Sequence, residues 1–417
     1  MWLDPFGLLA VTAMLVCYAL ESRSAWFVFG FAQIGGKGRI VQECFPPCTA
    51  PSEVITMSIT VERANEALQR VVDPNTLKDL VASRSARNVR VDGGDVSVDV
   101  ELGYPAASQI EPIRRAVIDA LKAAGAANVN ANVTMKIVAH TVQRGLKVMP
   151  NIKNIVAVAS GKGGVGKSTV AANLALALSS EGAKVGVLDA DIYGPSQPTM
   201  LGITGRPTTV DNRTLEPMEN HGLQVASIGL LIDADQPMVW RGPMVTQALQ
   251  QLLTQTNWRD LDYLVVDMPP GTGDIQLTLA QQVPVTGVVI VTTPQDIALM
   301  DAKKGLKMFE KVGVPILGIV ENMAVHVCSS CGHAEHIFGS EGGQKMASEY
   351  NVDFLGSLPL DIRIREQADS GRPTVIAEPD SPVAQSYKEI ARKVAVRIAE
   401  RAKDMSLKMP TIKVSNT

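Results

Sequence analysis

The chain has 417 residues, of which 46% are hydrophobic and 19% are charged. This length and composition are typical of a globular protein with two or three domains, and they exclude a disordered chain. The formal net charge of −3 gives no electrostatic reason to expect nucleic-acid binding. The five cysteines, an odd number, argue against a disulfide framework and favour a reducing cytoplasm.

The first 56 residues differ in character from the rest of the chain. Residues 6–20 form an apolar stretch that is shorter than the roughly 20 residues needed to span a bilayer. Asp4 precedes this stretch, where a secretory signal would carry Lys or Arg. We therefore interpret residues 1–56 as a leader that is disordered or not native, with Met57 as the natural start. A peripheral or single-span membrane anchor is the alternative.

Residues 57–140 are expected to form a small α+β domain with the order α-β-β-α-β. Apolar residues recur at helical spacing between 61 and 72, and the segment 73–75, Asp-Pro-Asn, ends that helix. Strands are expected at 89–91, 96–100 and 129–138, and a second helix at 110–124. This region has no cysteine and shows no catalytic pattern. A linker is expected over 141–153.

A phosphate-binding loop is predicted at the start of the next region. An apolar run at 155–159 is expected to be a buried strand, and 170–178 has the composition of an Ala/Leu-rich helix. The residues between them fit the pattern G-x-x-x-x-G-K-[ST], in which backbone N–H groups surround phosphate oxygens. Lys167 is predicted to contact the β- and γ-phosphates, and Ser168 to bind Mg²⁺. The predicted ATP-binding residues of the loop are Gly161, Lys162, Gly163, Gly164, Val165, Gly166, Lys167, Ser168 and Thr169.

Strands and helices alternate through residues 154–403, which predicts a doubly wound, mostly parallel sheet with ligands at the strand carboxyl ends. Strands are expected at 185–188, 263–266, 288–292, 315–320 and 353–358, and helices at 244–253, 297–311 and 342–349. A last helix at 383–402 carries one apolar face. Packing of this face in the core is favoured over membrane contact, because Glu389 and Glu400 interrupt its basic face. Residues 404–417 are expected to be a tail.

Three aspartates are predicted to lie near the phosphates. Asp189 and Asp191 follow the second strand of this region, and residues two apart on a strand point to the same side. Asp267 ends a buried apolar run and precedes Gly271 and Gly273. This order is typical of a Walker B carboxylate followed by a loop that senses the γ-phosphate.

Cys328 and Cys331 form a C-x₂-C pair, whose two thiolates can reach one metal centre. A four-ligand site needs two more donors. Three solutions stay open: a [4Fe–4S] cluster that bridges two chains, a local Zn²⁺ site completed by His333 and His336, or a redox dithiol. The bridging cluster is favoured, because the two histidines would crowd a tetrahedral site and the dithiol lacks a thioredoxin-like context.

Six motifs together resemble the Mrp/ApbC family of iron–sulfur cluster carriers, which have a deviant Walker A P-loop. They are K-G-G-V-G-K-S-T, D-A-D-I-Y-G-P-S, D-M-P-P-G-T-G-D, E-N-M, the cysteine pair and I-F-G. The region around 71–80 resembles a small domain of iron–sulfur assembly factors. The resemblance implies a homodimeric ATPase that uses ATP and Mg²⁺, and the cysteine usage favours a cytoplasmic location. The ATPase would bind a [4Fe–4S] cluster transiently and deliver the cluster to apoproteins. Its partners would be these apoproteins and cluster scaffold proteins.

The resemblance also implies roles for single residues. Lys162, Lys167 and Asp191 would be catalytic: Lys162 would reach the partner chain's nucleotide, and Asp191 would activate the attacking water. Asp189, with Ser168 and Asp267, would hold Mg²⁺ and its waters. For the base, Asn322 would read adenine, and Pro359 would belong to the loop that closes over it.

Two other classes of function are open. A positioning ATPase of the division-site or plasmid-partition type would share the nucleotide core and act at membrane or DNA. It would need a basic or amphipathic tail and no cysteine pair, so we expect neither a nucleic-acid partner nor a stable membrane contact. A scaffold with a vestigial ATP site is disfavoured, because every lysine and aspartate of the site is present.

Overall fold

The computed structural model describes residues 59–140, 149–209, 211, 213–231 and 242–408. The leader predicted at 1–56 and most of the predicted linker lie outside these residues. Met57–Thr417 form one compact unit.

The first described region has the predicted order α-β-β-α-β. It consists of α3 (Val61–Leu68), β1 (Ala86–Asp92), β2 (Asp95–Leu102), α4 (Ala107–Ala123) and β3 (Asn128–Met135). The sheet has the order β1-β2-β3, with β1 antiparallel and β3 parallel to β2. Alternate residues of β2 are buried (Val96, Val98 and Val100), so one face of the sheet packs against the two helices.

A large sheet of the order β13-β10-β9-β4-β8-β5-β7-β6 forms the second region. Every neighbouring pair is parallel except β6 and β7, which confirms the predicted doubly wound, mostly parallel sheet. Its strands are β4 (Ile152–Ala159), β5 (Val185–Asp189), β6 (Met218–Asn220), β7 (Leu223–Ser227), β8 (Leu261–Asp267), β9 (Gly287–Thr292), β10 (Ile316–Glu321) and β13 (Phe354–Ser357). β4 begins at Ile152, so the last two residues of the predicted linker belong to the sheet.

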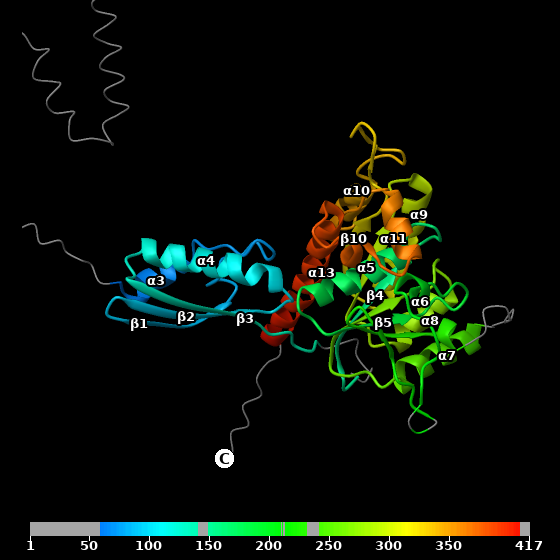
Figure 1. Ribbon diagram of the computed structural model, residues 1–417, viewed down its shortest axis with the longest axis horizontal. Helices are drawn as coiled ribbons and strands as arrows, with labels where there is room; N and C mark the ends of the chain where they lie inside the picture. Colours follow the sequence, from blue (N-terminus) through cyan, green and yellow to red (C-terminus); the bar gives the residue numbers. More distant parts are fainter. Residues whose placement is uncertain (1–58, 141–148, 210, 212, 232–241, 409–417) are drawn as a thin grey trace, which may run out of the picture. The chain divides into compact units, whose positions relative to one another are not determined.

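Helices cover both faces of this sheet (Figure 1). Val156 and Val158 of β4 face a core shared with α5 and α13, while Ile155, Ala157 and Ala159 face a core shared with α7, α8, α9 and α10. This alternation explains why the strand is a continuous apolar run: both of its faces are buried. The helices are α5 (Lys167–Ser180), α6 (Gln197–Met200), α7 (Gly242–Gln255), α8 (Asp274–Gln282), α9 (Asp296–Lys311), α10 (Gly342–Glu349), α11 (Ile362–Asp369), α12 (Thr374–Ala377) and α13 (Pro382–Lys408).

The apolar face of α13 lies in the core, as predicted. Tyr387, Ile390, Val394 and Ile398 are buried against the sheet side that also holds α5. Within the described residues, no helix combines the length and the apolar character needed to cross a membrane.

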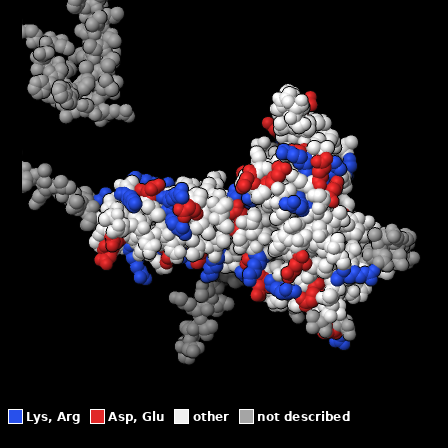
Figure 2. Space-filling view, in the orientation of Figure 1, with Lys and Arg blue, Asp and Glu red and all other residues white. Residues whose placement is uncertain are grey.

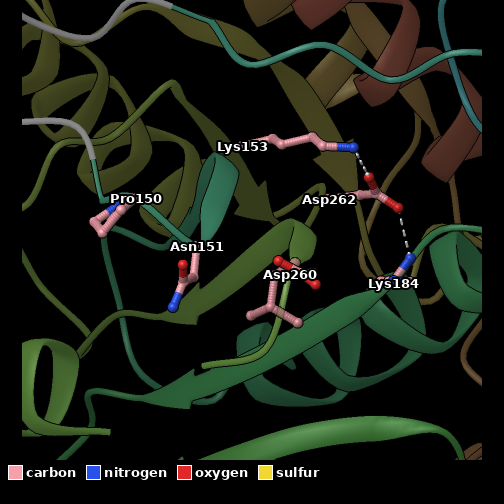
Figure 3. A pocket seen from close by; sticks show the side chains of 7 residues that line it. Pro150, Asn151, Lys153, Lys184, Asp260 and Asp262 are labelled. Carbon is pink, nitrogen blue, oxygen red and sulfur yellow. Dashed lines mark hydrogen bonds and ion pairs between the residues drawn. The ribbon is translucent and has the colours of Figure 1, made fainter. Parts of the chain in front are cut away.

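A cavity of about 450 Å³ opens at the edge where β4, β5 and β8 begin. Figure 3 shows the Lys153 ammonium pointing at the Asp262 carboxylate, at 2.7 Å, while the other oxygen of that carboxylate accepts from the backbone N–H of Lys184 at 2.8 Å. These bonds join the starts of three neighbouring strands. Since ligands of such sheets bind at the opposite, carboxyl edge, we assign this cavity a structural role.

Candidate functional site

The predicted phosphate loop connects the carboxyl end of β4 to the amino end of α5. A side chain at Gly161 would place its Cβ 2.2 Å from the backbone carbon of Asp301 in α9. Gly166 has a φ of +82°, and a Cβ there would lie 2.2 Å from the Asn322 amide nitrogen. Only glycine fits at either position. The loop therefore packs closely against two other segments, and its N–H groups and the α5 N-terminus form a cradle suited to phosphate.

Lys167 and Lys162 of this loop lie in different environments. The Lys167 side chain is 6% exposed. Its ammonium pairs with Asp267, lies 3.8 Å from Asp191 and donates to Ser168 Oγ at 3.1 Å. Lys162 is exposed at the mouth of a cavity of about 210 Å³ that the loop lines. Within the described part of the chain, no ion pair involves the Lys162 ammonium. Lys167 is thus held inside its own site, and Lys162 is available to an outside anion.

The three predicted aspartates converge beside Lys167. Asp189 and Asp267 are register partners at the carboxyl ends of β5 and β8, and both are fully buried. Asp189 accepts hydrogen bonds from Ser227 Oγ at 3.0 Å and from the backbone N–H of Asp191 at 3.2 Å. One ammonium therefore stands among three carboxylates, which leaves an excess of negative charge in a buried site.

Burial and the charge of Asp267 raise the pKa values of two of these acids, Asp189 and Asp191. Desolvation, and then the charge of Asp267, raise the pKa of Asp189 to about 7. Burial also raises the pKa of Asp191, an effect that the nearby Lys167 opposes. A carboxylate whose pKa is raised toward neutrality is a better proton acceptor at neutral pH. A divalent cation would relieve the repulsion between Asp189 and Asp267.

The residues around these carboxylates fit Mg²⁺. Ser168, Asp189 and Asp267 offer the oxygen donors that this ion prefers. Two further oxygens, Ser196 Oγ and Gln197 Oε1, are buried and have no hydrogen-bond partner. Unpartnered buried oxygens are rare, and the waters that Mg²⁺ retains would serve them as donors. Gln197 lies just beyond the D-A-D-I-Y-G-P-S motif, and no local pattern in the sequence marks it.

Asn322 and Pro359 lie on neighbouring connections. Asn322 follows β10, is 7% exposed, and donates from its amide to the Val165 carbonyl at 2.9 Å. The chain after β13 pairs with the same segment, since the Leu358 N–H donates to the Glu321 carbonyl at 2.9 Å. Pro359 follows and is half-buried. The structure thus places Asn322 against the phosphate loop. Recognition of the adenine base by Asn322 stays a prediction.

The cysteine pair lies on a short hairpin made by β11 (His326–Val327) and β12 (Ala334–Glu335). The Cys328 N–H donates to the His333 carbonyl, and the Gly332 N–H to the Cys328 carbonyl, both at 2.9 Å. Backbone N–H groups of Cys331 and Ser330 lower the pKa of the Cys328 thiol. Cys331 is exposed. The turn therefore favours the thiolate form of Cys328, and thiolate is the form of cysteine that binds metal.

The two histidines near the pair do not complete a site with it. Among the residues that the structure describes, no group of three or more His, Cys, Asp or Glu side chains is placed to hold a metal ion. Nδ1 of His336 is hydrogen-bonded to the Ala324 carbonyl oxygen at 2.7 Å. The local Zn²⁺ alternative is therefore not assembled within one chain.

Helix α9 contacts the phosphate loop and the start of α10. Its Asp301 lies against Gly161 of the phosphate loop, and its Leu299 lies against Gly342, at the end of the segment that carries the hairpin. A cavity of about 570 Å³ lies between α9, α10 and the residues from Phe338 to Gly342. One helix thus contacts both the nucleotide loop and the chain that follows the cysteine hairpin.

The surface of the hairpin is almost uncharged. Residues 324–340 carry a single Asp, Glu, Lys or Arg side chain, Glu335. In Figure 1 this segment is the gold loop that extends past α9 and α10. Elsewhere on the face shown in Figure 2, Lys and Arg alternate with Asp and Glu, and neither sign forms a large continuous patch.

Two family models match the chain. Residues 151–395 match the ParA model, described as "NUBPL iron-transfer P-loop NTPase". Residues 62–134 match the model of an "iron-sulfur cluster assembly protein". The two matches coincide with the large parallel sheet and with the small three-stranded region.

Curated proteins resemble the chain over most of their own length. An "iron-sulfur cluster carrier protein" of Haemophilus influenzae is 50% identical over 346 residues, which cover 82% of this chain and 94% of that protein. A protein of the same name from Pseudomonas fragi is 62% identical over 269 residues, or 64% of this chain and 94% of that protein. The mouse "iron-sulfur cluster transfer protein NUBPL" is 50% identical, over 61% of this chain and 82% of that protein.

A solved structure shares the fold. The nucleotide-binding protein from Archaeoglobus fulgidus, in complex with ADP, is 37% identical and superimposes with a TM-score of 0.50. The match covers 56% of this chain and 92% of that one.

Proposed function

The chain belongs to the NUBPL iron-transfer P-loop NTPase family, and from that premise we propose that it is an ATPase that carries an iron–sulfur cluster to apoproteins. One observation carries the proposal: the same chain holds a complete P-loop site and a surface pair of thiols, and the hairpin lowers the pKa of the Cys328 thiol. ATP and Mg²⁺ are its cofactors, and the cluster is its cargo.

The site residues suit ATP hydrolysis. In the structure Lys167 pairs with Asp267 and lines the cavity at the phosphate loop. With ATP present, its ammonium binds the β- and γ-phosphates. Asp191, whose pKa is raised, accepts a proton from the attacking water. Ser168, Asp189 and Asp267 hold Mg²⁺, which when bound neutralises charge on the phosphate oxygens. The phosphates bind at the α5 N-terminus, where N–H groups face them.

We propose that the cluster is a [4Fe–4S] cluster bound between two copies of the chain. A cluster of this type takes four thiolates, and the described residues supply only Cys328 and Cys331. Two observations support a homodimer. The Lys162 ammonium is exposed and outside any ion pair of the described residues. Val327 and Ile337, which flank the cysteine turn, are 52% and 53% exposed, and a second chain that shares the cluster would cover them.

Nucleotide state is proposed to act on the cluster through α9. Movement of the phosphate loop against Asp301 would shift α9, and with it the segment at Gly342 that follows the hairpin. The domain limits (57–140, 141–153, 154–403 and 404–417), the cytoplasmic location and the roles of Asn322 and Pro359 remain part of the proposal.

Anaerobic reconstitution with iron and sulfide tests the carrier function. The full chain should bind four irons per two chains, with thiolate-to-iron absorbance bands, and should pass the cluster to an apoprotein. Cys331→Ala should lose the cluster and keep ATP binding. Ser330→Ala, a neighbouring exposed residue that is no ligand, is the matched control and should retain it. Four irons per chain, or a cluster retained by Cys331→Ala, would contradict the bridging site.

A further inference from the structure

Gln197, the first residue of α6, is completely buried beside the aspartates. Glutamine is a mostly exposed residue type, and a buried amide lowers stability unless its polar atoms are hydrogen-bonded. The surroundings of this side chain therefore call for an explanation beyond packing.

The amide nitrogen of Gln197 joins two parts of the ATP site. Nε2 donates to the Ser168 carbonyl at 3.0 Å and to Asp267 Oδ2 at 2.9 Å. Both partners can only accept, so the nitrogen end of the amide is fixed in this position. The backbone N–H of Gln197 donates to Asp189 Oδ2 at 3.2 Å. Gln197 thus contacts all three proposed Mg²⁺ ligands, which are Ser168, Asp189 and Asp267.

The amide oxygen of Gln197 has no partner. Oε1 is buried and forms no hydrogen bond, as is also true of the neighbouring Ser196 Oγ. An unsatisfied buried acceptor lowers the stability of the folded protein. This oxygen belongs to the amide whose nitrogen contacts Asp267, and the neighbouring Ser196 lines the cavity at the phosphate loop. Mg²⁺ usually keeps several of its waters in proteins, and each such water is a hydrogen-bond donor.

We propose that Gln197 is a positioning residue for Mg²⁺. Its NH₂ group holds the Asp267 carboxylate and the Ser168 segment in one arrangement, and its oxygen accepts from a water that the ion brings. The inference rests on the proposed ATP site. Residues that orient metal ligands typically affect metal affinity by about 10–100-fold, so the effect is measurable in binding and does not depend on turnover.

The test is ADP binding to the full, cluster-free chain by calorimetry, once with Mg²⁺ and once with EDTA. The ratio of the two affinities measures how well the ion is held. Gln197→Met keeps the length of the side chain but neither donates nor accepts as an amide does. We expect this ratio to fall by about 10-fold or more, with the affinity in EDTA unchanged.

Gln197→Glu is a second variant with a distinct signature. It loses both donated hydrogen bonds and adds a carboxylate beside Asp189 and Asp267. The free protein should melt at a lower temperature than wild type, and Mg²⁺ should raise its melting temperature by more than it does in wild type. This variant keeps the proposal testable if Gln197→Met does not fold.

Asn173→Ala is the matched control. Asn173 is also a fully buried amide; it donates to the Thr169 carbonyl at 3.0 Å and accepts from the Val375 N–H at 3.1 Å, with no carboxylate among these partners. It should lower stability and leave the Mg²⁺ ratio unchanged. If Gln197→Met behaves in the same way, or if Mg²⁺ raises the melting temperature of Gln197→Glu no more than that of wild type, the proposal is overturned. Failure of wild type to bind ADP at all would instead refute the ATP site.

Discussion

Lys167→Ala should destabilise the protein even when no nucleotide is present. The Lys167 ammonium is buried, pairs with Asp267 and lies 3.8 Å from Asp191. Its removal leaves buried carboxylates without a cation. The variant is therefore expected to lose stability as well as ATP binding, and the two losses have separate physical causes.

The size of the loss follows from two estimates. Removing one partner of a buried ion pair costs about 3–5 kcal/mol. The protein can instead take up one further proton in the carboxylate cluster. For an acid with an unfolded pKa of about 3.9, this costs about 1.36 kcal/mol per pH unit above that value, or about 4 kcal/mol at pH 7. At pH 5 the free-energy cost of this protonation falls to about 1.5 kcal/mol. The destabilisation should therefore shrink as the pH is lowered.

Thermal unfolding followed by circular dichroism in EDTA, without nucleotide, checks this reasoning. A loss of 3–4 kcal/mol in a domain of this size lowers the melting temperature by roughly 6–16 °C at pH 7, and by much less at pH 5. Lys162→Ala is the control: that side chain is exposed and unpaired within the described residues, so the change should stay within about 0.5 kcal/mol. Equal effects of the two variants, or a Lys167→Ala loss that does not depend on pH, would refute the argument.

Three further predictions concern separate residues. Asp191→Asn should keep ATP affinity and slow hydrolysis by about 10²–10⁴-fold, because the amide cannot accept the proton of water; an equal loss of binding, measured by calorimetry, would make the role structural. Burial lowers the pKa of His140, so below pH 6.5 the unfolded chain binds a proton that the folded chain does not, and stability falls as the pH falls. His140→Leu should weaken that pH dependence in urea unfolding between pH 7 and 5.5, and an unchanged slope would contradict it. Glu181→Ala should cost about 3–5 kcal/mol in urea unfolding, because the buried carboxylate pairs with Arg392 and accepts from Ser108 Oγ at 2.8 Å; a loss below about 1 kcal/mol would show that solvent screens the pair.

The sequence alone determined the local parts of the site. Gly161, Gly166, Lys167 and Ser168 are spaced for a loop between a strand and a helix, and the structure shows that loop. Such motifs are readable because their geometry depends on neighbouring residues along the chain. The alternation of apolar strands with helices likewise predicted the parallel sheet, since both faces of such strands are buried. The C-x₂-C pair could also be recognised from the sequence, because two thiols in one turn depend only on local geometry.

Only the tertiary structure decided which distant groups meet. Asp189 and Asp267 become neighbours because β5 and β8 are adjacent in the sheet, a strand order that no periodicity specifies. The short edge strand β6 and its neighbour β7 were not predicted, because they carry no clear alternation. Gln197 is an unremarkable residue in the sequence, yet folding buries it between Ser168 and Asp267. The physical reason is that contacts between residues far apart in the chain depend on packing and strand order, whereas sequence patterns record only local geometry.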